Sequence, residues 1–147
     1  MKKIVLLILI LFLTGCGSKY IKCTTDIDNE SLNYKFHAEY KIYYKDKYVT
    51  KIVKNEKYTT DNKNRLNYLK EYKELEYDML SKSYGGYKYK VTTSKEAVRI
   101  KTTITAKNLN VKRMVDDKII DKYYTSNNKI LLSGLKKHYE SKSAVCK

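Results

Sequence analysis

The feature that most constrains the fold of this chain is a regular alternation of apolar and polar side chains from Leu32 to Tyr44. Successive side chains of a β-strand point to opposite faces of the sheet. The alternation therefore predicts a long antiparallel strand with one face buried against a core and the other face exposed. The apolar parity of this run consists of Leu32, Tyr34, Phe36, Ala38, Tyr40, Ile42 and Tyr44.

The residues that follow predict that the chain turns back and forms a hairpin. Lys45-Asp46-Lys47 is a polar turn, and Tyr48–Thr59 is expected to return beside the first strand. Val49 and Ile52 differ in parity, which indicates a β-bulge near the start of the returning strand.

A long amphipathic helix is predicted over Asn62–Tyr84, with Asp61 as its N-cap. Its apolar residues recur at intervals of three and four, which predicts one stripe that packs against a sheet. Gly85-Gly86 follows directly, and glycine adopts at little steric cost the positive φ that commonly ends a helix. The stripe consists of Leu66, Leu69, Tyr72, Leu75, Met79, Leu80 and Tyr84.

The other segments add strands on both sides of this helix and two helices after them. Tyr20–Asp26 predicts a first strand, which a turn at Asp28-Asn29 ends. Alternation on both sides of Ser94-Lys95 predicts a second hairpin. A short helix is expected over 111–119. A last helix, capped by Asn127 or Asn128, carries Leu131, Leu132, Leu135, His138 and Tyr139.

This order, β-β-β-α-β-β-α-α, is that of an α+β domain. We expect a mostly antiparallel sheet with the long helix packed on one face. Residues 16–147 are enough for one domain and too few for two cores of ordinary size.

The first fifteen residues have the features of an export signal. Lys2 and Lys3 precede the apolar run Ile4–Leu13, which is about half as long as a membrane-spanning helix. Leu13-Thr14-Gly15-Cys16 resembles the lipobox of bacterial lipoproteins, which implies cleavage before Cys16 and a diacylglyceryl thioether on its sulfur. The alternative is an ordinary secretory signal followed by a chance cysteine. We therefore expect a removed signal peptide (1–15), a lipidated tether (16–19) and a single α+β domain (20–147).

If Cys16 is acylated, Cys23 and Cys146 remain as a pair in an oxidising compartment. One lies near the start of the expected domain and the other is the penultimate residue. A disulfide between them would join the two ends of the domain, and the alternative is two unrelated buried thiols.

The formal net charge is +15, and loss of Lys2 and Lys3 with the leader would leave +13. A charge of this size is typical of nucleic-acid-binding proteins. The export signal and the lack of zinc-finger or RNA-binding motifs argue against nucleic acid as a partner. The many Lys, Asn, Tyr and Ile residues also fit the bias of an A+T-rich genome. Two interpretations therefore stay open: a solvated surface shaped by composition, or attraction to anionic cell-envelope polymers or lipid head groups.

The sequence holds few groups for catalysis, and we expect no metal or cofactor. His37 falls on the polar parity of its strand, and His138 lies beside Tyr139, where we expect a partly buried, hydrogen-bonded ring. None of the common hydrolase, phosphate-loop or zinc motifs occurs. The chain has 16 tyrosines, which are expected mainly in the core. A tyrosine-lined groove interleaved with lysine could instead hold a sugar or an acidic polymer.

The lipobox, the cysteine in the first strand, the order of elements and the terminal Val-Cys-Lys together resemble the YehR-like family of small bacterial lipoproteins. The resemblance implies Cys16 as the lipid acceptor and Cys23 with Cys146 as a pair. We expect a non-catalytic binding module anchored at the extracytoplasmic face of the cell membrane, with an unknown ligand. The alternatives are a structural envelope protein that adheres by charge and an enzyme with an unrecognised site.

Overall fold

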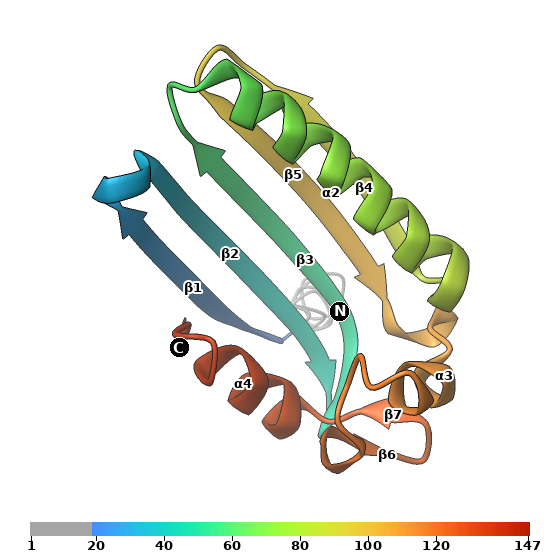
Figure 1. Cartoon of the computed structure of the whole chain (residues 1–147). Helices are drawn as coiled ribbons and strands as arrows, with labels where there is room; N and C mark the ends of the chain where they lie inside the picture. Colours follow the sequence, from blue (N-terminus) through green and yellow to red (C-terminus); the bar gives the residue numbers. More distant parts are fainter. Residues whose placement is uncertain (1–18) are drawn as a thin grey trace, which may run out of the picture.

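The structure is a computed structural model and describes residues 19–147 (Figure 1). Its strands are β1 (Tyr20–Asn29), β2 (Tyr34–Lys45), β3 (Tyr48–Thr59), β4 (Tyr87–Thr93), β5 (Ala97–Thr105), β6 (Thr125–Ser126), β7 (Lys129–Ile130) and β8 (Val145–Cys146). Its α-helices are α2 (Lys63–Tyr84), α3 (Val111–Asp116) and α4 (Leu132–Glu140). Three short 3₁₀ turns are η1 (Glu30–Leu32), η2 (Ala106–Asn108) and η3 (Lys122–Tyr124).

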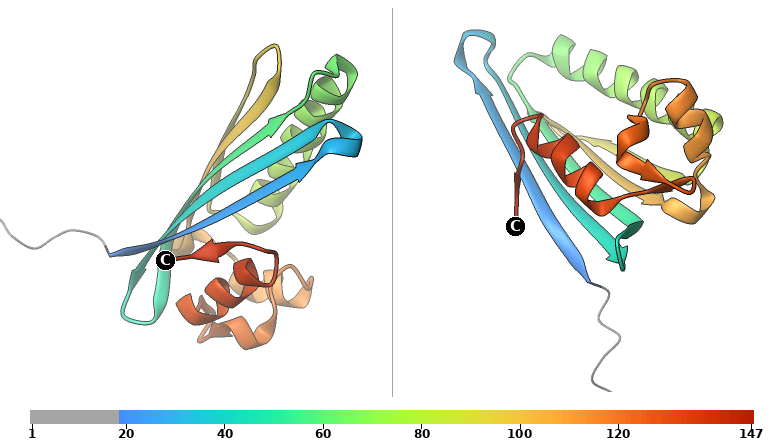
Figure 2. Two further views of the ribbon diagram at one scale, coloured as in Figure 1. Left: turned by 90° about the vertical axis from the view of Figure 1, so that its left-hand side faces the viewer. Right: turned by 90° about the horizontal axis from the view of Figure 1, so that it is seen from below.

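Six strands form one sheet in the order β4-β5-β3-β2-β1-β8, and every neighbouring pair is antiparallel. Helix α2 lies over β4 and β5, while α4 lies on the same side near β2 (Figure 1). In Figure 2, α2, α3 and α4 lie on one side of the sheet, and no other described element covers the opposite side. The α+β class and the mostly antiparallel sheet are confirmed. Within residues 19–147, no helix is long and apolar enough to cross a bilayer.

The central hairpin of β2 and β3 has the predicted pattern. Ala38, Tyr40 and Ile42 are buried on the inner face of β2. The register shifts after Tyr43, which pairs with Lys51, whereas the next residue pairs with Val49. One residue of β3 is therefore unpaired, and the predicted bulge is confirmed.

The start of the sheet differs from the prediction. Strand β1 continues through Asp28-Asn29, where a turn was expected, because this segment pairs with the start of β2. The reversal follows instead in η1 and at Asn33, whose φ is 43°.

The long helix has nearly the predicted bounds, but its cap and buried face differ. Asn62 rather than Asp61 is the N-cap, and its Oδ1 accepts a hydrogen bond from the Arg65 N–H at 3.0 Å. The buried residues are Leu66, Tyr77 and Tyr84. Three members of the predicted stripe are exposed instead: Tyr72, Leu75 and Met79. The helix is rotated toward Tyr77 because that side chain reaches a buried carboxylate on the sheet.

The last helix begins later than predicted. Asn127 and Asn128 do not cap it, because they form the turn between β6 and β7, with φ of 51° and 55°. Two consecutive positive φ values are typical of a tight hairpin turn, and asparagine tolerates them well. Helix α4 begins at Leu132, and no side chain caps it. The short helix α3 ends at Asp116, so Ile119 lies outside it.

The C-terminal residues add a sixth strand beside β1. Cys23 and Cys146 are cross-strand neighbours, with sulfurs 1.98 Å apart and Cα atoms 4.0 Å apart, compatible with a disulfide. The adjacent pair, Lys22 and Lys147, exchanges both backbone hydrogen bonds. The cysteines therefore occupy a non-hydrogen-bonded position, where Cα atoms lie closest.

Candidate functional site

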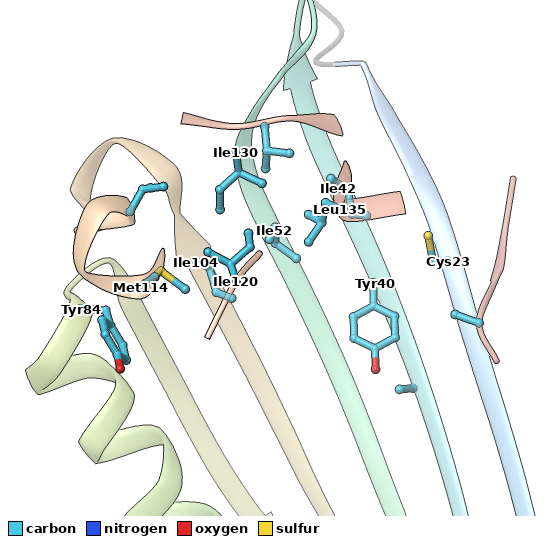
Figure 3. Packing of buried hydrophobic residues seen from close by; sticks show 14 residues of the cluster. Cys23, Tyr40, Ile42, Ile52, Tyr84, Ile104, Met114, Ile120, Ile130 and Leu135 are labelled. Carbon is cyan, nitrogen blue, oxygen red and sulfur yellow. The ribbon is translucent and has the colours of Figure 1, made fainter. Parts of the chain in front are cut away.

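The buried core is divided into two clusters with a cavity between them. One cluster surrounds Ile42 and Leu135 beneath α3 and α4, and the other lies beneath α2 around Leu66. Figure 3 shows the first cluster and the Tyr40 hydroxyl pointing away from Ile42 and Leu135. Three side chains pack against both clusters, and all of them line the cavity: Phe36, Leu80 and Tyr87.

The cavity, which we call the tyrosine cavity, has a volume of about 390 Å³. The inner face of the sheet forms its floor, and α2 and α4 form its walls. A volume of this size suits a small organic ligand. Its lining residues are Thr25, Ile27, Phe36, Tyr40, Lys54, Glu76, Tyr77, Leu80, Tyr87, Ile104, His138, Tyr139 and Lys142.

Three tyrosine hydroxyls in this lining have no hydrogen-bond partner within residues 19–147: those of Tyr40, Tyr87 and Tyr139. The rings of Tyr40 and Tyr139 pack together with centroids 4.2 Å apart. Burial raises the pKa of Tyr139, and the neighbouring Tyr40 and Tyr87 raise it further. The three hydroxyls are not sealed off, because only Thr102 Oγ1 is both enclosed and unpartnered in the described chain. The cavity thus offers several free donors and acceptors.

A buried ionic network joins the floor of the cavity to α2. Glu56 is only 4 % exposed, and its Oε1 lies 2.9 Å from Lys54 Nζ. The same oxygen accepts a hydrogen bond from Tyr58 at 3.0 Å, while Oε2 accepts one from the Tyr77 hydroxyl at 2.5 Å. Lys54 Nζ also donates to the Tyr77 oxygen at 2.8 Å. Both carboxylate oxygens are therefore satisfied, which a buried charge requires.

The electrostatics keep the tyrosines of the site neutral at ordinary pH. Burial, and then the negative charge of Glu56, raise the pKa of Tyr58 and Tyr77 well above its usual value. The same two causes raise the pKa of Tyr40 to about 12. Burial, with a smaller effect of Tyr84, raises the pKa of Tyr87 to about 12. The phenols of Tyr40 and Tyr87, which make no hydrogen bond within residues 19–147, can therefore donate hydrogen bonds to a ligand throughout the physiological range.

His138 adds an imidazole to the α4 wall. Burial, and then the nearby Lys142, lower its pKa, so the ring is neutral near pH 7. It packs edge-on against Tyr124 and Tyr139, with centroids 6.2 and 5.7 Å away. The expected partial burial is confirmed, but the ring makes no hydrogen bond within the described residues.

The other candidate residues lie away from the cavity. His37 is exposed on the outer face of the sheet, and its Nδ1 lies 2.6 Å from Asp26 on β1. Cys23 and Cys146 lie at the opposite edge of the sheet from β4. Cys16 lies outside the described residues. Within those residues, no three His, Cys, Asp or Glu side chains are grouped as a metal site requires.

Lys54 and Glu56 are not among the predicted site residues, although the sequence pattern of β3 holds a signal for them. Both share the buried parity of β3 with Ile52 and Tyr58. Two opposite charges at alternate positions of a buried strand face predict an ion pair in the core. Their partner Tyr77 lies on α2, and only the tertiary fold brings it to them.

No family model matches the sequence, and no curated protein matches it. The fold is similar to the NMR structure of the Escherichia coli YehR protein, with a TM-score of 0.53, 14% identity and coverage of 88% of this chain and 92% of that one. It is also similar to the NMR structure of a protein from Streptococcus pneumoniae TIGR4, with a TM-score of 0.51, 12% identity and coverage of 92% and 90%. The chain thus resembles YehR in fold, as the sequence resemblance predicts.

Proposed function

We propose that this chain is a lipid-anchored, non-catalytic binding module of the bacterial cell envelope, and that the tyrosine cavity holds its ligand. The observation that carries the ligand site is the group of three unpartnered hydroxyls on Tyr40, Tyr87 and Tyr139. Partly desolvated hydroxyls without partners cost free energy. A ligand that supplies the missing hydrogen bonds recovers that cost.

The leader and Cys16 support the anchor. Two acyl chains hold a protein on a membrane, whereas one chain gives only marginal binding. Strand β1 begins at Tyr20, four residues after Cys16. Four extended residues span at most about 14 Å. The acylated chain would therefore stay close to the extracytoplasmic surface of the membrane.

The chemistry of the cavity favours a neutral, polyhydroxylated ring such as a sugar. Aromatic faces stack on the apolar faces of such rings, and the phenols and the His138 imidazole can donate to and accept from its hydroxyls. Lys54 supplies little net charge to a ligand because Glu56 pairs with it. An anionic ligand would meet Lys142, a cation of this lining that makes no ion pair within residues 19–147.

The anchor is tested by metabolic labelling of the full chain with a palmitate analogue. The wild type should be labelled and remain with the membrane fraction, and Cys16→Ser should lose both properties. An unlabelled wild type, or a Cys16→Ser variant that remains membrane-bound, would refute the anchor.

The cavity is tested by ligand-observed NMR with a panel of neutral mono- and disaccharides. Tyr87→Phe and Tyr139→Phe remove a hydroxyl and keep the ring, so each should weaken binding of the best saccharide by about tenfold, which corresponds to one lost hydrogen bond of about 1.4 kcal/mol. Tyr123→Phe is the matched control because Tyr123 is 88% exposed. Failure of the whole panel to bind, or equal loss in all three variants, would refute a saccharide site.

A structural envelope protein that adheres by charge is the second candidate, because the chain would keep a charge of +13 after loss of the two leader lysines from +15. Charge-driven adhesion should weaken steeply between low and physiological ionic strength. Saccharide binding in the cavity should change little over that range. An enzyme with an unrecognised site is the third candidate, and turnover of a saccharide during the NMR titration would favour it.

A further inference from the structure

No element of the described residues 19–147 covers the outer face of the sheet, on the side away from the helices (Figure 2). Side chains on β3, β4 and β5 alternate between this face and the core. The buried residues Ile52, Val98 and Ile100 identify the parity that faces the core. The cations that β3, β4 and β5 carry outward are Lys51, Lys57, Lys88, Lys90, Arg99 and Lys101.

Charge is distributed unequally over this face. Most outward cations of β1 and β2 lie beside an acid: Lys22 lies 2.6 Å from Glu39, and Lys35 lies 2.7 Å from Asp28. The outward residues of β3, β4 and β5 include no acid. Lys57, Lys90, Arg99 and Lys101 make no ion pair within residues 19–147. A solvated surface set by composition alone does not require this division.

The same cations oppose one another across the strands. Lys90 pairs in register with Lys101, and Lys57 pairs with Arg99. Like charges directly opposite each other destabilise a sheet. All four residues line a depression of about 350 Å³ in the outer face, beside Asn55 and Thr92.

We propose that the outer face of β3, β4 and β5 binds a linear phosphodiester polymer of the cell envelope. Cross-strand neighbours are about 5 Å apart and alternate residues of a strand are about 6.7 Å apart. The four cations can therefore meet successive phosphates of an extended chain. Asn55 and Thr92 add hydrogen-bonding groups. The proposed export would place this face among the polymers of the cell envelope, so the identity of the polymer rests on that proposed function.

Binding is tested on residues 16–147 with Cys16→Ser, which keep every described strand and helix and need no acylation. The probe is poly(glycerol phosphate), titrated over a range of salt concentrations. Lys90→Gln/Lys101→Gln should weaken binding by about tenfold or more. It should also reduce the slope of log Kd against log salt by about 1.5, because two phosphate contacts are lost. Lys22→Gln/Lys35→Gln removes the same charge from the same face and should change the slope little.

A stability measurement separates a binding role from a structural one. Relief of the like-charge contact should raise the Tm of free Lys101→Gln by about 1–3 °C, whereas a structural lysine would lower it on substitution. Equal loss of binding in the two double variants would overturn the proposal. So would equal affinity of the wild type for polyglutamate, or tighter binding to phosphatidylglycerol vesicles, which would assign the face to carboxylates or to the bilayer. Failure of palmitate labelling leaves these results unaffected.

Discussion

Lys54 Nζ lies 2.9 Å from the carboxylate of Glu56, two residues further along β3, and both side chains face the core. The ammonium and the Tyr77 hydroxyl together connect the sheet to α2. The pair thus stabilises the floor of the tyrosine cavity and the position of its α2 wall.

Glu56→Gln should lower the free energy of unfolding by about 2–3 kcal/mol, because it leaves Lys54 largely buried without a counter-charge. Urea unfolding measures the loss. Glu71→Gln is the control and should change stability by less than about 0.5 kcal/mol, since Glu71 is exposed. Lys54→Met/Glu56→Gln should recover part of the loss. A cost for Glu56→Gln no greater than that of the control would show that the network contributes nothing.

Stability should fall in alkali. Tyr40 and Tyr87 have a pKa of about 12 in the folded state, and tyrosines in the unfolded chain ionise near 10. A raised folded-state pKa gives stability that is complete below pH 10 and is lost between pH 10 and 12 as the unfolded chain ionises first. Urea midpoints from about pH 9 to about 11 should therefore decrease. Tyr87→Phe should make the decrease shallower, and Tyr123→Phe should not. Identical pH profiles for both variants would contradict the assignment.

Two leucine substitutions test which face of α2 packs against the sheet. Leu66 is 2% exposed and Leu75 is 70% exposed. Leu66→Ala should cost about 2–5 kcal/mol through lost burial and a cavity, whereas Leu75→Ala should cost less than about 0.5 kcal/mol. Chemical denaturation of the two variants tests which face of α2 is buried. If the predicted stripe were the buried face, both substitutions would lower the free energy of unfolding by comparable amounts.

Local sequence signals predicted the elements whose structure depends mainly on neighbouring residues in the sequence. The alternation around Tyr40 defined β2, the parity change between Val49 and Ile52 defined the bulge, and Gly85 ends α2 with φ 68°. The signals failed where distant contacts decide. The apolar stripe predicted that Leu75 rather than Tyr77 is buried. Hydropathy takes no account of the hydrogen bond that the Tyr77 hydroxyl donates to the buried carboxylate of Glu56.

The periodicity of the sequence could not predict the short elements or the cavity. Strands β6, β7 and β8 have two residues each, which is too few for an alternation to be recognised. Asn127 and Asn128 suit a cap and a hairpin turn equally well by composition. The tyrosine cavity joins residues from five strands and two helices, and no segment of the sequence contains it.

Cys23 and Cys146 lie 123 residues apart in sequence but are adjacent in the sheet. A disulfide that closes so long a loop should stabilise the domain by about 4–5 kcal/mol, mainly by restricting the unfolded chain. Reduction should therefore lower the Tm by roughly ten degrees or more. Cys23→Ser/Cys146→Ser should match the reduced wild type and respond to no reductant. Strand β8 directly follows α4, which forms one wall of the tyrosine cavity. The reduced wild type and the double serine variant should therefore both bind ligand in this cavity more weakly than the oxidised protein. Two freely titratable thiols in the oxidised, exported protein would refute the bond.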